Sequence, residues 1–460
     1  MLLSLGLLTG CGGGEGKGAG APSRPTPDAS ASATRQSGPA YKGAALPELA
    51  RTPVWSVRAR HNLGCAGDPA EQAAAHVLAG DDVQACVVGD AVVLTEDLTK
   101  ADDMNQAIGQ HYRVRLYDAH TGRVRRTVDT DLPDGWPSER PARASAYVQT
   151  TQWKDGSPAL LVIDGDEVPA DGLKKATVRT TYTMYAPSGA VLGRSSFTGD
   201  AYTDLTAEAG HLLMREGPGT STYTPIGGGA DVQVHDRGDD QDPLGSGFGY
   251  YVHSSYDAWD GSGSKLVVSD RRTGKEMWTL DDVGRPAALA KDDDATPVLH
   301  PLTADKGLLV WDLPAGAAHG ALLTVVDLRT GRLLAEGPQL DTGNVDRLQS
   351  VLSADGSTAV TRMGAGAVAW NVTTGKELWR QEEGEQDITP LALPTTKTLY
   401  ADAGDDLGLA AVDMATKKVV GKNLVSDVYG VGSSSALQFT PDGYGVLADG
   451  DFFVFAPQKG

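Results

Sequence analysis

The chain has 460 residues, and 40 Lys plus Arg face 60 Asp plus Glu, which gives a formal net charge of -20. Nucleic-acid phosphates are bound by basic stripes, so this acidic balance argues against a nucleic-acid partner. The length allows a large core and, at ~100–200 residues per domain, two to four domains, unless a repeat builds a single larger one.

The chain begins with a segment that favours export. Residues 1–10 are apolar but too short to cross a bilayer as a helix, which needs about 20 residues, and they fit the end of a secretory signal. "LTGC", ending at Cys11, resembles the bacterial lipobox, which implies cleavage before Cys11 and lipidation of its thiol. No Lys or Arg precedes the run, so we interpret residues 1–10 as a signal-peptide remnant whose start lies upstream. The alternative is a chance hydrophobic N-terminus with a free thiol.

The next segment is predicted to be a linker. Residues 12–40 are rich in Gly, Ser, Ala and Pro and contain no aromatic or large aliphatic residue. Such a segment buries too little apolar surface to offset the entropy of ordering, so it is expected to stay flexible. We therefore predict a lipidated cysteine with a flexible linker over 11–47, a folded domain over 48–460, and localisation on the outer face of the cytoplasmic membrane.

Cys65 and Cys86 are predicted to form a disulfide, because two cysteines in an exported protein normally pair. Between them, Asp68 followed by Pro69 and an acid two residues later has the pattern of a helix N-terminus. The sequence therefore predicts a short helical insert over 65–86, pinned by the disulfide. Two buried free thiols are the alternative.

A short phrase typical of strand, tight turn and strand recurs along the chain. "LYDAHTGRV", "VSDRRTGKEMW", "VVDLRTGRL", "WNVTTGKELW" and "AVDMATKKV" share it, and "MYAPSGAVL" places Ser188 in the slot of the Thr. The Asp or Asn is expected to bond backbone N–H groups across the turn, and Gly to supply a positive φ. The predicted structural turn residues of the four complete copies are Asp118, Thr121, Gly122, Asp270, Thr273, Gly274, Asp327, Thr330, Gly331, Asn371, Thr374 and Gly375.

The period of the phrase predicts the fold. The last gaps between turn Thr residues are 44 and 42 residues, and a degenerate unit with its turn near 227–229 divides the longest gap. A truncated copy begins at "FVFAPQKG", while the strand around Trp55 has no turn before it and can complete that copy. Repeats of ~40–50 residues with four strands each predict an all-β chain folded as a β-propeller, with eight blades or alternatively seven, whose N-terminal strand joins the C-terminal blade.

The pattern D-x-x-T-G-K-x-x-W resembles the repeat of the pyrroloquinoline-quinone propeller family, from about Ala50 onwards. The resemblance implies that Trp55, Trp278 and Trp379 dock between blades. In one copy Lys417 replaces the turn Gly, so that turn is expected to be strained or of another type. Many members of this family bind no quinone and act as scaffolds or sensors, so the repeat is not by itself evidence for a cofactor.

Enzymatic signatures are weak. A quinone dehydrogenase resembling this family would need a Ca²⁺ site of Glu, Asn and Asp and often has adjacent cysteines, and neither pattern is evident. The histidines are scattered without zinc-site spacing, and no G-x-S-x-G motif occurs. We predict no catalytic residue, metal or cofactor. A quinone-dependent dehydrogenase or a polysaccharide-acting enzyme remains the alternative.

The expected function is therefore a non-catalytic extracytoplasmic lipoprotein propeller that binds proteins or ligands. Its partner would be an envelope protein, a glycan or a small ligand, and its membrane contact would be the lipid anchor. Four aromatic residues outside the repeat turns are candidates for a binding surface, with packing between blades as the alternative: Trp136, Trp153, Tyr256 and Trp259.

Overall fold

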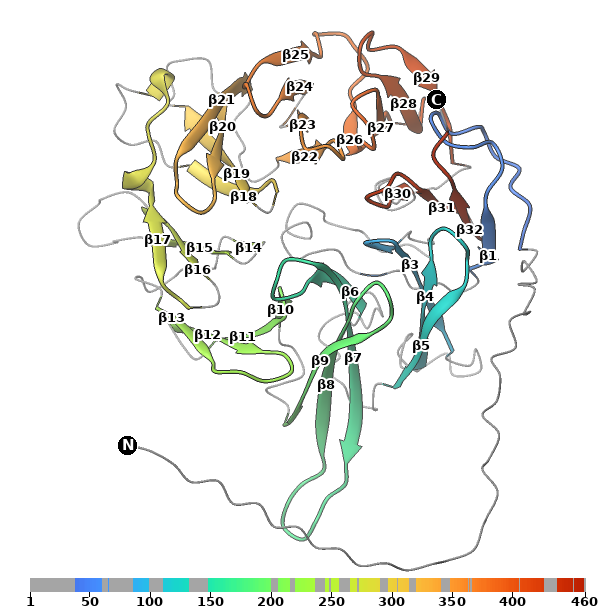
Figure 1. Cartoon of the computed structure of the whole chain (residues 1–460), viewed down its shortest axis with the longest axis vertical. Helices are drawn as coiled ribbons and strands as arrows, with labels where there is room; N and C mark the ends of the chain where they lie inside the picture. The colour runs from blue at the N-terminus through green and yellow to red at the C-terminus, as the bar shows by residue number, and fades with distance from the viewer. Residues whose placement is uncertain are drawn as a thin grey trace, which may run out of the picture. The chain divides into compact units, whose positions relative to one another are not determined.

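The computed structural model describes residues 38–59, 65, 86–98, 111–131, 148–199, 206–215, 220–235, 245–247, 250–255, 265–270, 273–289, 297–303, 305–313, 320–340, 348–362, 364, 366–404, 406–425, 437–449 and 451–458. Within these residues the chain forms eight four-stranded antiparallel sheets (Figure 1). The all-β prediction is confirmed. We number the sheets 1 to 8 in the order in which their second strands occur.

The bounds of the strands in sheets 1 to 4 are as follows. Sheet 1 consists of β2 (Val87–Val88), β3 (Ala91–Asp97), β4 (His111–Asp118) and β5 (Val124–Asp131). Sheet 2 consists of β6 (Val148–Gln152), β7 (Pro158–Val168), β8 (Thr177–Tyr185) and β9 (Val191–Thr198). Sheet 3 consists of β10 (Thr206–Glu208), β11 (His211–Arg215), β12 (Thr220–Pro225) and β13 (Val232–His235). Sheet 4 consists of β14 (Gly245–Gly247), β15 (Tyr250–Ser255), β16 (Lys265–Asp270) and β17 (Glu276–Thr279).

The remaining elements include two short 3₁₀ helices after sheet 4, η3 (Leu280–Asp282) and η4 (Ala287–Leu289). Sheet 5 consists of β18 (Pro297–Pro301), β19 (Lys306–Leu313), β20 (Gly320–Asp327) and β21 (Leu333–Leu340). Sheet 6 consists of β22 (Gln349–Leu352), β23 (Thr358–Arg362), β24 (Ala367–Asn371) and β25 (Glu377–Arg380). Sheet 7 consists of β26 (Thr389–Ala392), β27 (Thr398–Asp402), β28 (Leu409–Asp413) and β29 (Val419–Gly421).

Sheet 8 combines both ends of the folded chain. Its strands are β30 (Leu437–Phe439), β31 (Gly445–Asp449), β32 (Asp451–Phe455) and β1 (Trp55–Arg58), in the spatial order β1-β32-β31-β30. Trp55 pairs with Val454 and Arg58 with Asp451. The strand around Trp55 therefore occupies the fourth position of the sheet, as the truncated C-terminal repeat predicts.

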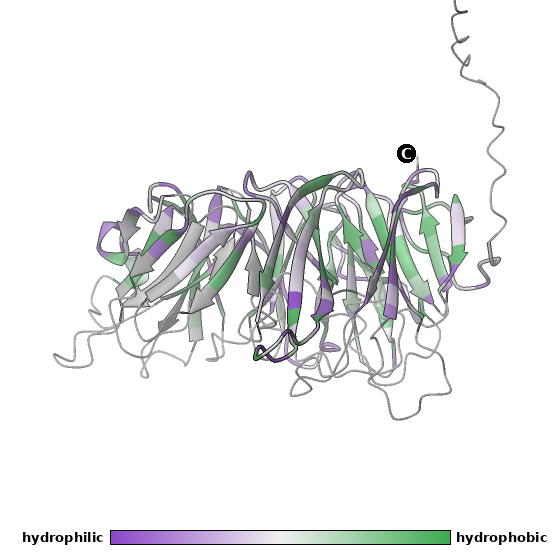
Figure 2. Cartoon of the chain, turned by 90° about the horizontal axis from the view of Figure 1, so that it is seen from below, coloured by the Kyte–Doolittle hydropathy of each residue, from purple (hydrophilic) through white to green (hydrophobic). Residues whose placement is uncertain are grey.

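Burial changes in a regular way across each sheet. In sheets 6 and 7 the third strands, β24 and β28, are buried over four of their five residues, whereas the fourth strands, β25 and β29, contain no fully buried residue. Strands covered on both faces are expected to be continuously apolar, and Figure 2 shows the apolar residues concentrated in strands and the hydrophilic ones in turns. In sheets 6 and 7 the fourth strand is therefore an exposed edge.

The cores lie between consecutive sheets. One buried cluster joins sheets 4 and 5 through Val268 and Leu309, and the next joins sheets 5 and 6 through Leu323 and Trp370. A further cluster joins sheet 8 to sheet 1. The clusters therefore lie between sheets that neighbour one another in the chain, and one lies between the last sheet and the first.

The folded unit begins before the predicted boundary at residue 48. Tyr41 packs on Phe453 and Phe455 with ring centroids 5.1 and 5.0 Å away, and Leu46 is 3% exposed. The Tyr400 hydroxyl also donates a hydrogen bond to the Pro47 carbonyl. Residues 38–47 thus belong to the folded unit and not to the linker, because they contain the first apolar side chains large enough to be anchored on sheets 7 and 8.

Candidate functional site

The recurring phrase forms the connection between the third and fourth strands of a sheet. In the turn between β24 and β25, Asn371 Oδ1 accepts hydrogen bonds from the Thr374 backbone N–H at 2.9 Å and its hydroxyl at 3.0 Å. The Gly375 N–H donates to the Asn371 carbonyl at 2.8 Å. The same set is found in the turns that begin at Asp118, Asp270, Asp327 and Asp413. The side-chain acceptor and the Thr are therefore used to close the turn.

The turn glycine also touches the preceding sheet. Gly122, Gly274, Gly331 and Gly375 have φ angles between 66° and 72°, a region that L-residues rarely adopt. A Cβ on Gly375 would lie against the Glu336 carbonyl oxygen of β21, and a Cβ on Gly274 would lie 2.9 Å from the Gln233 carbonyl oxygen of β13. Glycine is thus required for two reasons, its backbone angle and the close approach of the preceding sheet.

Two tryptophans pack against the turn of the next sheet and donate a hydrogen bond to it. Trp278 is 2% exposed, and its Nε1–H donates to the Leu328 carbonyl of the next sheet at 2.7 Å. Trp55 donates in the same way to the Ala119 carbonyl at 2.6 Å, and its ring stacks on Tyr117. The indole of each also covers the turn glycine of that next sheet. These residues therefore pack between sheets and offer no free aromatic face.

The third tryptophan departs from the pattern. Trp379 Nε1 is buried and has no hydrogen-bond partner among the described residues. The turn opposite it carries Lys417 where its equivalents carry glycine, and Lys417 adopts φ 56°. Its Nζ donates to the Arg380 carbonyl at 3.2 Å and pairs with Glu385 at 2.7 Å. The turn therefore keeps its type, with a non-glycine residue held in the left-handed region.

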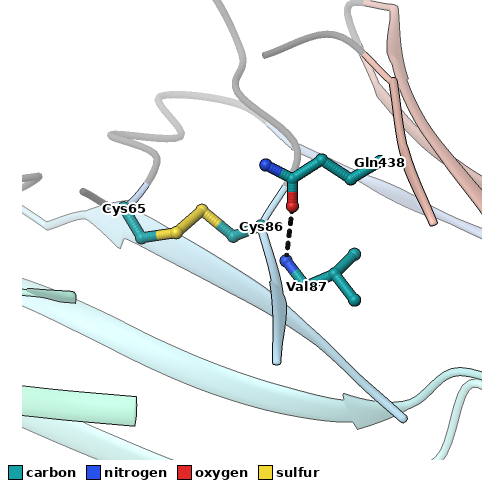
Figure 3. Close-up of a disulfide and its surroundings, with 4 residues drawn as sticks. All are labelled: Cys65, Cys86, Val87 and Gln438. Atoms are coloured by element: carbon teal, nitrogen blue, oxygen red, sulfur yellow. Dashed lines mark hydrogen bonds between the residues drawn. A yellow bond between two sulfur atoms is a disulfide. The ribbon is translucent and has the colours of Figure 1, made fainter. Parts of the chain in front are cut away.

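The disulfide lies at the seam between the last sheet and the first. Cys65 follows β1, which belongs to sheet 8, and Cys86 directly precedes β2 of sheet 1, with an S–S distance of 2.03 Å (Figure 3). Beside it, the Val87 N–H donates to Gln438 Oε1 of β30 at 2.9 Å (Figure 3). The predicted bridge is present and links the two sheets covalently; the predicted helix inside 65–86 lies outside the described residues.

Polar contacts between turns also join sheet 1 to sheet 8. His120 Nε2 lies 2.6 Å from Asp442 Oδ2, and the His120 ring meets Tyr444 edge-on with centroids 4.6 Å apart. Partial burial alone would raise the pKa of Asp442, but hydrogen bonds from Thr440 and His120 outweigh it and hold that pKa below its usual value. This ion pair crosses from sheet 1 to the first hairpin of sheet 8.

Arg125 continues the network from sheet 1 towards sheet 2. Its guanidinium donates to both carboxylate oxygens of Asp90, to Asp118 and to the Pro187 carbonyl. The hydrogen bond from Arg125 lowers the pKa of Asp90. These charges satisfy one another within sheet 1, and only the bond to the Pro187 carbonyl crosses to sheet 2. Structural networks of this kind perturb pKa values as active sites do.

The predicted binding-surface residues are only partly described. Trp136, Tyr256 and Trp259, like the lipidation residue Cys11, lie outside the described residues. Trp153 is half-buried, and a Cβ on Gly193 or Gly210 would lie 2.7 or 2.9 Å from its ring, which places it between sheets 2 and 3. The shared binding surface of these four aromatics therefore stays a prediction.

Sequence reasoning missed a second family of turns, between the first and second strands. The Ser353 and Thr440 hydroxyls donate to Asp355 and Asp442 at 2.7 and 2.6 Å. The signal was present in "SADGS" and "TPDGY". Within the part of the chain that the structure describes, no group of three or more His, Cys, Asp or Glu side chains could hold a metal ion, and no helix is long and apolar enough to cross a membrane.

A family model described as outer membrane protein assembly factor BamB matches residues 110–423. The match runs from β4 to just beyond β29 and covers about two thirds of the chain. The chain belongs to this family of pyrroloquinoline-quinone-like propeller repeats. Its four-stranded sheets correspond to propeller blades, whereas β1, the disulfide and β30 to β32 lie outside the matched region.

Other comparisons add no functional argument. No curated protein matches the chain. A eukaryotic initiation factor shares 8% identity over 75% of this chain and 90% of its own, with a TM-score of 0.39. Hsv2 of Kluyvelomyces marxianus shares 9% over 72% and 92%, with a TM-score of 0.32. The Cps50 (Swd1) β-propeller domain of Myceliophteria thermophila shares 11% over 72% and 95%, with a TM-score of 0.33.

Proposed function

We propose that this member of the propeller family is a non-catalytic binding scaffold, lipid-anchored on the outer face of the cytoplasmic membrane. The observation that carries the proposal is the use of the repeat residues. In the five turns that begin with Asp or Asn, that residue and the Thr close the turn. The glycines and Trp55 and Trp278 are used to dock sheets on one another. The side chains of the repeat are thus used to close turns and to pack sheets together. Partner binding is therefore assigned to the loops and hairpins.

We further propose that the eight sheets are eight blades of one closed ring. Trp55 links sheet 8 to sheet 1, Arg125 links sheet 1 to sheet 2, and Lys417 links sheet 7 to sheet 6. Tyr400 of sheet 7 packs on Phe439 of sheet 8 with ring centroids 5.3 Å apart. Closure removes the free faces that an open row of sheets would leave at its ends, and the disulfide supports it at the seam.

The proposed anchor is Cys11, with the residues before Gly38 as its tether. The test is mass spectrometry of the N-terminal peptide of the chain isolated from membranes of its own host. The expected result is a peptide that begins at Cys11 and carries acyl chains. A peptide that extends through residues 1–10 with an unmodified thiol would contradict the anchor.

The non-catalytic role is tested by titrating the purified chain with pyrroloquinoline quinone and Ca²⁺. The expected result is no stoichiometric change in quinone absorbance and no dye reduction with alcohols or sugars. Tight one-to-one quinone binding with dye reduction would replace the scaffold by a dehydrogenase. Partner binding is tested by crosslinking the anchored chain on membranes and identifying the products. The expected result is a discrete protein partner.

A further inference from the structure

The hairpin formed by β7 and β8 is longer than its equivalents. Nine residue pairs join these strands, from Leu160–Tyr185 to Val168–Thr177, whereas five join β23 to β24. β6 accompanies β7 only as far as Val162, and β9 accompanies β8 only to Arg179. Figure 1 shows the hairpin projecting away from the neighbouring sheets. Beyond Val162 the hairpin is therefore a ribbon flanked by β9 alone, and only its last pairs, Glu167–Val178 and Val168–Thr177, with the turn that follows lie beyond both neighbouring strands.

The base of this ribbon is held firmly. The Tyr112 hydroxyl of β4 donates to the Ile163 carbonyl at 2.6 Å, and the Asp131 N–H at the end of β5 donates to Asp164 Oδ1 at 3.1 Å. An isolated two-stranded hairpin is marginal in water, so contacts of this kind decide its direction. Beyond Asp164 β7 continues for four residues, about 13 Å at the usual strand rise, with β9 beside β8 as far as Arg179. Sheet 1 thus fixes the direction in which sheet 2 presents the tip.

The tip is a preformed turn with one leucine at its apex. Asp171 and Lys174 exchange two backbone hydrogen bonds, of 3.2 and 3.0 Å. Gly172 stands at the first central position with φ 59°, as a type II′ turn requires. Leu173 at the second position is 105% exposed, and Lys174 and Lys175 follow it, also exposed. Leu173 makes no buried contact within the described residues, and the turn restricts its backbone conformation.

The chemistry of the tip selects the kind of partner. The chain has a net charge of -20, yet the apex carries two adjacent ammonium groups beside an exposed aliphatic side chain. A glycan would need an aromatic platform, and residues 164–179 contain no aromatic residue. An anionic lipid surface would meet the exposed carboxylates of Asp166, Glu167 and Asp171 along with the lysines. An apolar protein pocket rimmed by carboxylates on the side of the lysines fits both features.

We propose that the β7–β8 tip is a docking element that inserts Leu173 into an apolar pocket of a partner protein, with Lys174 and Lys175 pairing to acidic groups at its rim. The proposal rests on the scaffold function and names the surface and the partner chemistry. Preorganisation of the turn reduces the entropy cost of docking. Charge pairing contributes mainly to the rate and the specificity of encounter.

The first test places the photo-crosslinker benzoylphenylalanine at position 173 of the full-length chain in its own host. The matched control carries it at Val191, which is 50% exposed on the same sheet. The expected result is one discrete protein adduct from position 173, absent from position 191, and lost when Lys174→Glu and Lys175→Glu are added. Adducts that form from other surface positions but not from 173 would refute the docking tip while leaving the scaffold function intact.

The second test uses the protein identified in that adduct, purified and titrated with the full chain. Leu173→Ala is expected to weaken binding by roughly 10- to 100-fold, the range for one buried aliphatic side chain, and Val191→Ala to leave it unchanged. The Lys174→Glu, Lys175→Glu variant is expected to bind more slowly, with a smaller dependence on salt. Unchanged near-ultraviolet circular dichroism verifies folding. Adducts only to lipid, or only to a second copy of this chain, would overturn the proposal.

Discussion

The seam tryptophans allow a sharp test of how the repeat stabilises the fold. Trp278→Phe removes an indole N–H that reaches the Leu328 carbonyl at 2.7 Å, whereas Trp379→Phe removes an N–H that has no partner among the described residues. The first change leaves a buried carbonyl unsatisfied, which costs about 1–3 kcal/mol. The second removes a buried donor without breaking a bond. Trp278 is also more deeply buried than Trp379, so the difference between them sets an upper limit for the hydrogen bond.

The assay is guanidinium unfolding of each variant, followed by tryptophan fluorescence and far-ultraviolet circular dichroism. We expect Trp278→Phe to lower the free energy of unfolding by about 1–3 kcal/mol more than Trp379→Phe. A protein of this size need not unfold in two states, so coincidence of the two signals is the necessary control. Equal losses at the two positions would show that ring area alone matters and would refute the reasoning about the seams.

Three further predictions concern the turns and the ring seam. Lys417→Gly relieves a left-handed non-glycine residue and is expected to raise stability by about 0.5–1 kcal/mol by guanidinium unfolding; a loss would mean that the contacts of its ammonium group outweigh the strain. The lowered pKa of Asp442 means that its contribution is present above its ordinary value of 3.8 and is lost as the pH falls through the lower folded pKa. Asp442→Asn should therefore be less stable than the natural chain at pH 7 but approach it as the pH falls below the folded pKa of Asp442, and parallel thermal curves throughout would contradict this. Replacing Cys65 and Cys86 by Ser should lower stability by about 3 kcal/mol, measured against the oxidised natural chain, and no loss would show that the seam holds without the bridge.

Much of the architecture follows from local sequence patterns. The turn phrase consists of an Asp or Asn acceptor, a Thr and a Gly, and its hydrogen bonds join residues close in sequence. It can therefore be recognised before any fold is known. Its period also predicted that the strand around Trp55 would complete the C-terminal sheet, and β1 pairs with β32. The disulfide followed from the cysteine count in an exported chain.

Other features depended on contacts between distant segments. Nothing local marks residues 38–47 as part of the folded unit, because their partners Phe453 and Tyr400 lie more than 350 residues away. The His120–Asp442 pair and the unpartnered indole of Trp379 arise the same way, from which turn faces which strand across a seam.

The sequence by itself determined the repeat, its turn chemistry and the pairing of the two chain ends, because these are set by periodicity and by hydrogen bonds close in sequence. Only the tertiary structure decided which turns meet which strands, where glycine is needed for close approach, and that the β7–β8 hairpin leaves its sheet with Leu173 at the apex. The physical reason is that packing between sheets joins residues far apart in the chain, and their spacing carries no signal of that contact.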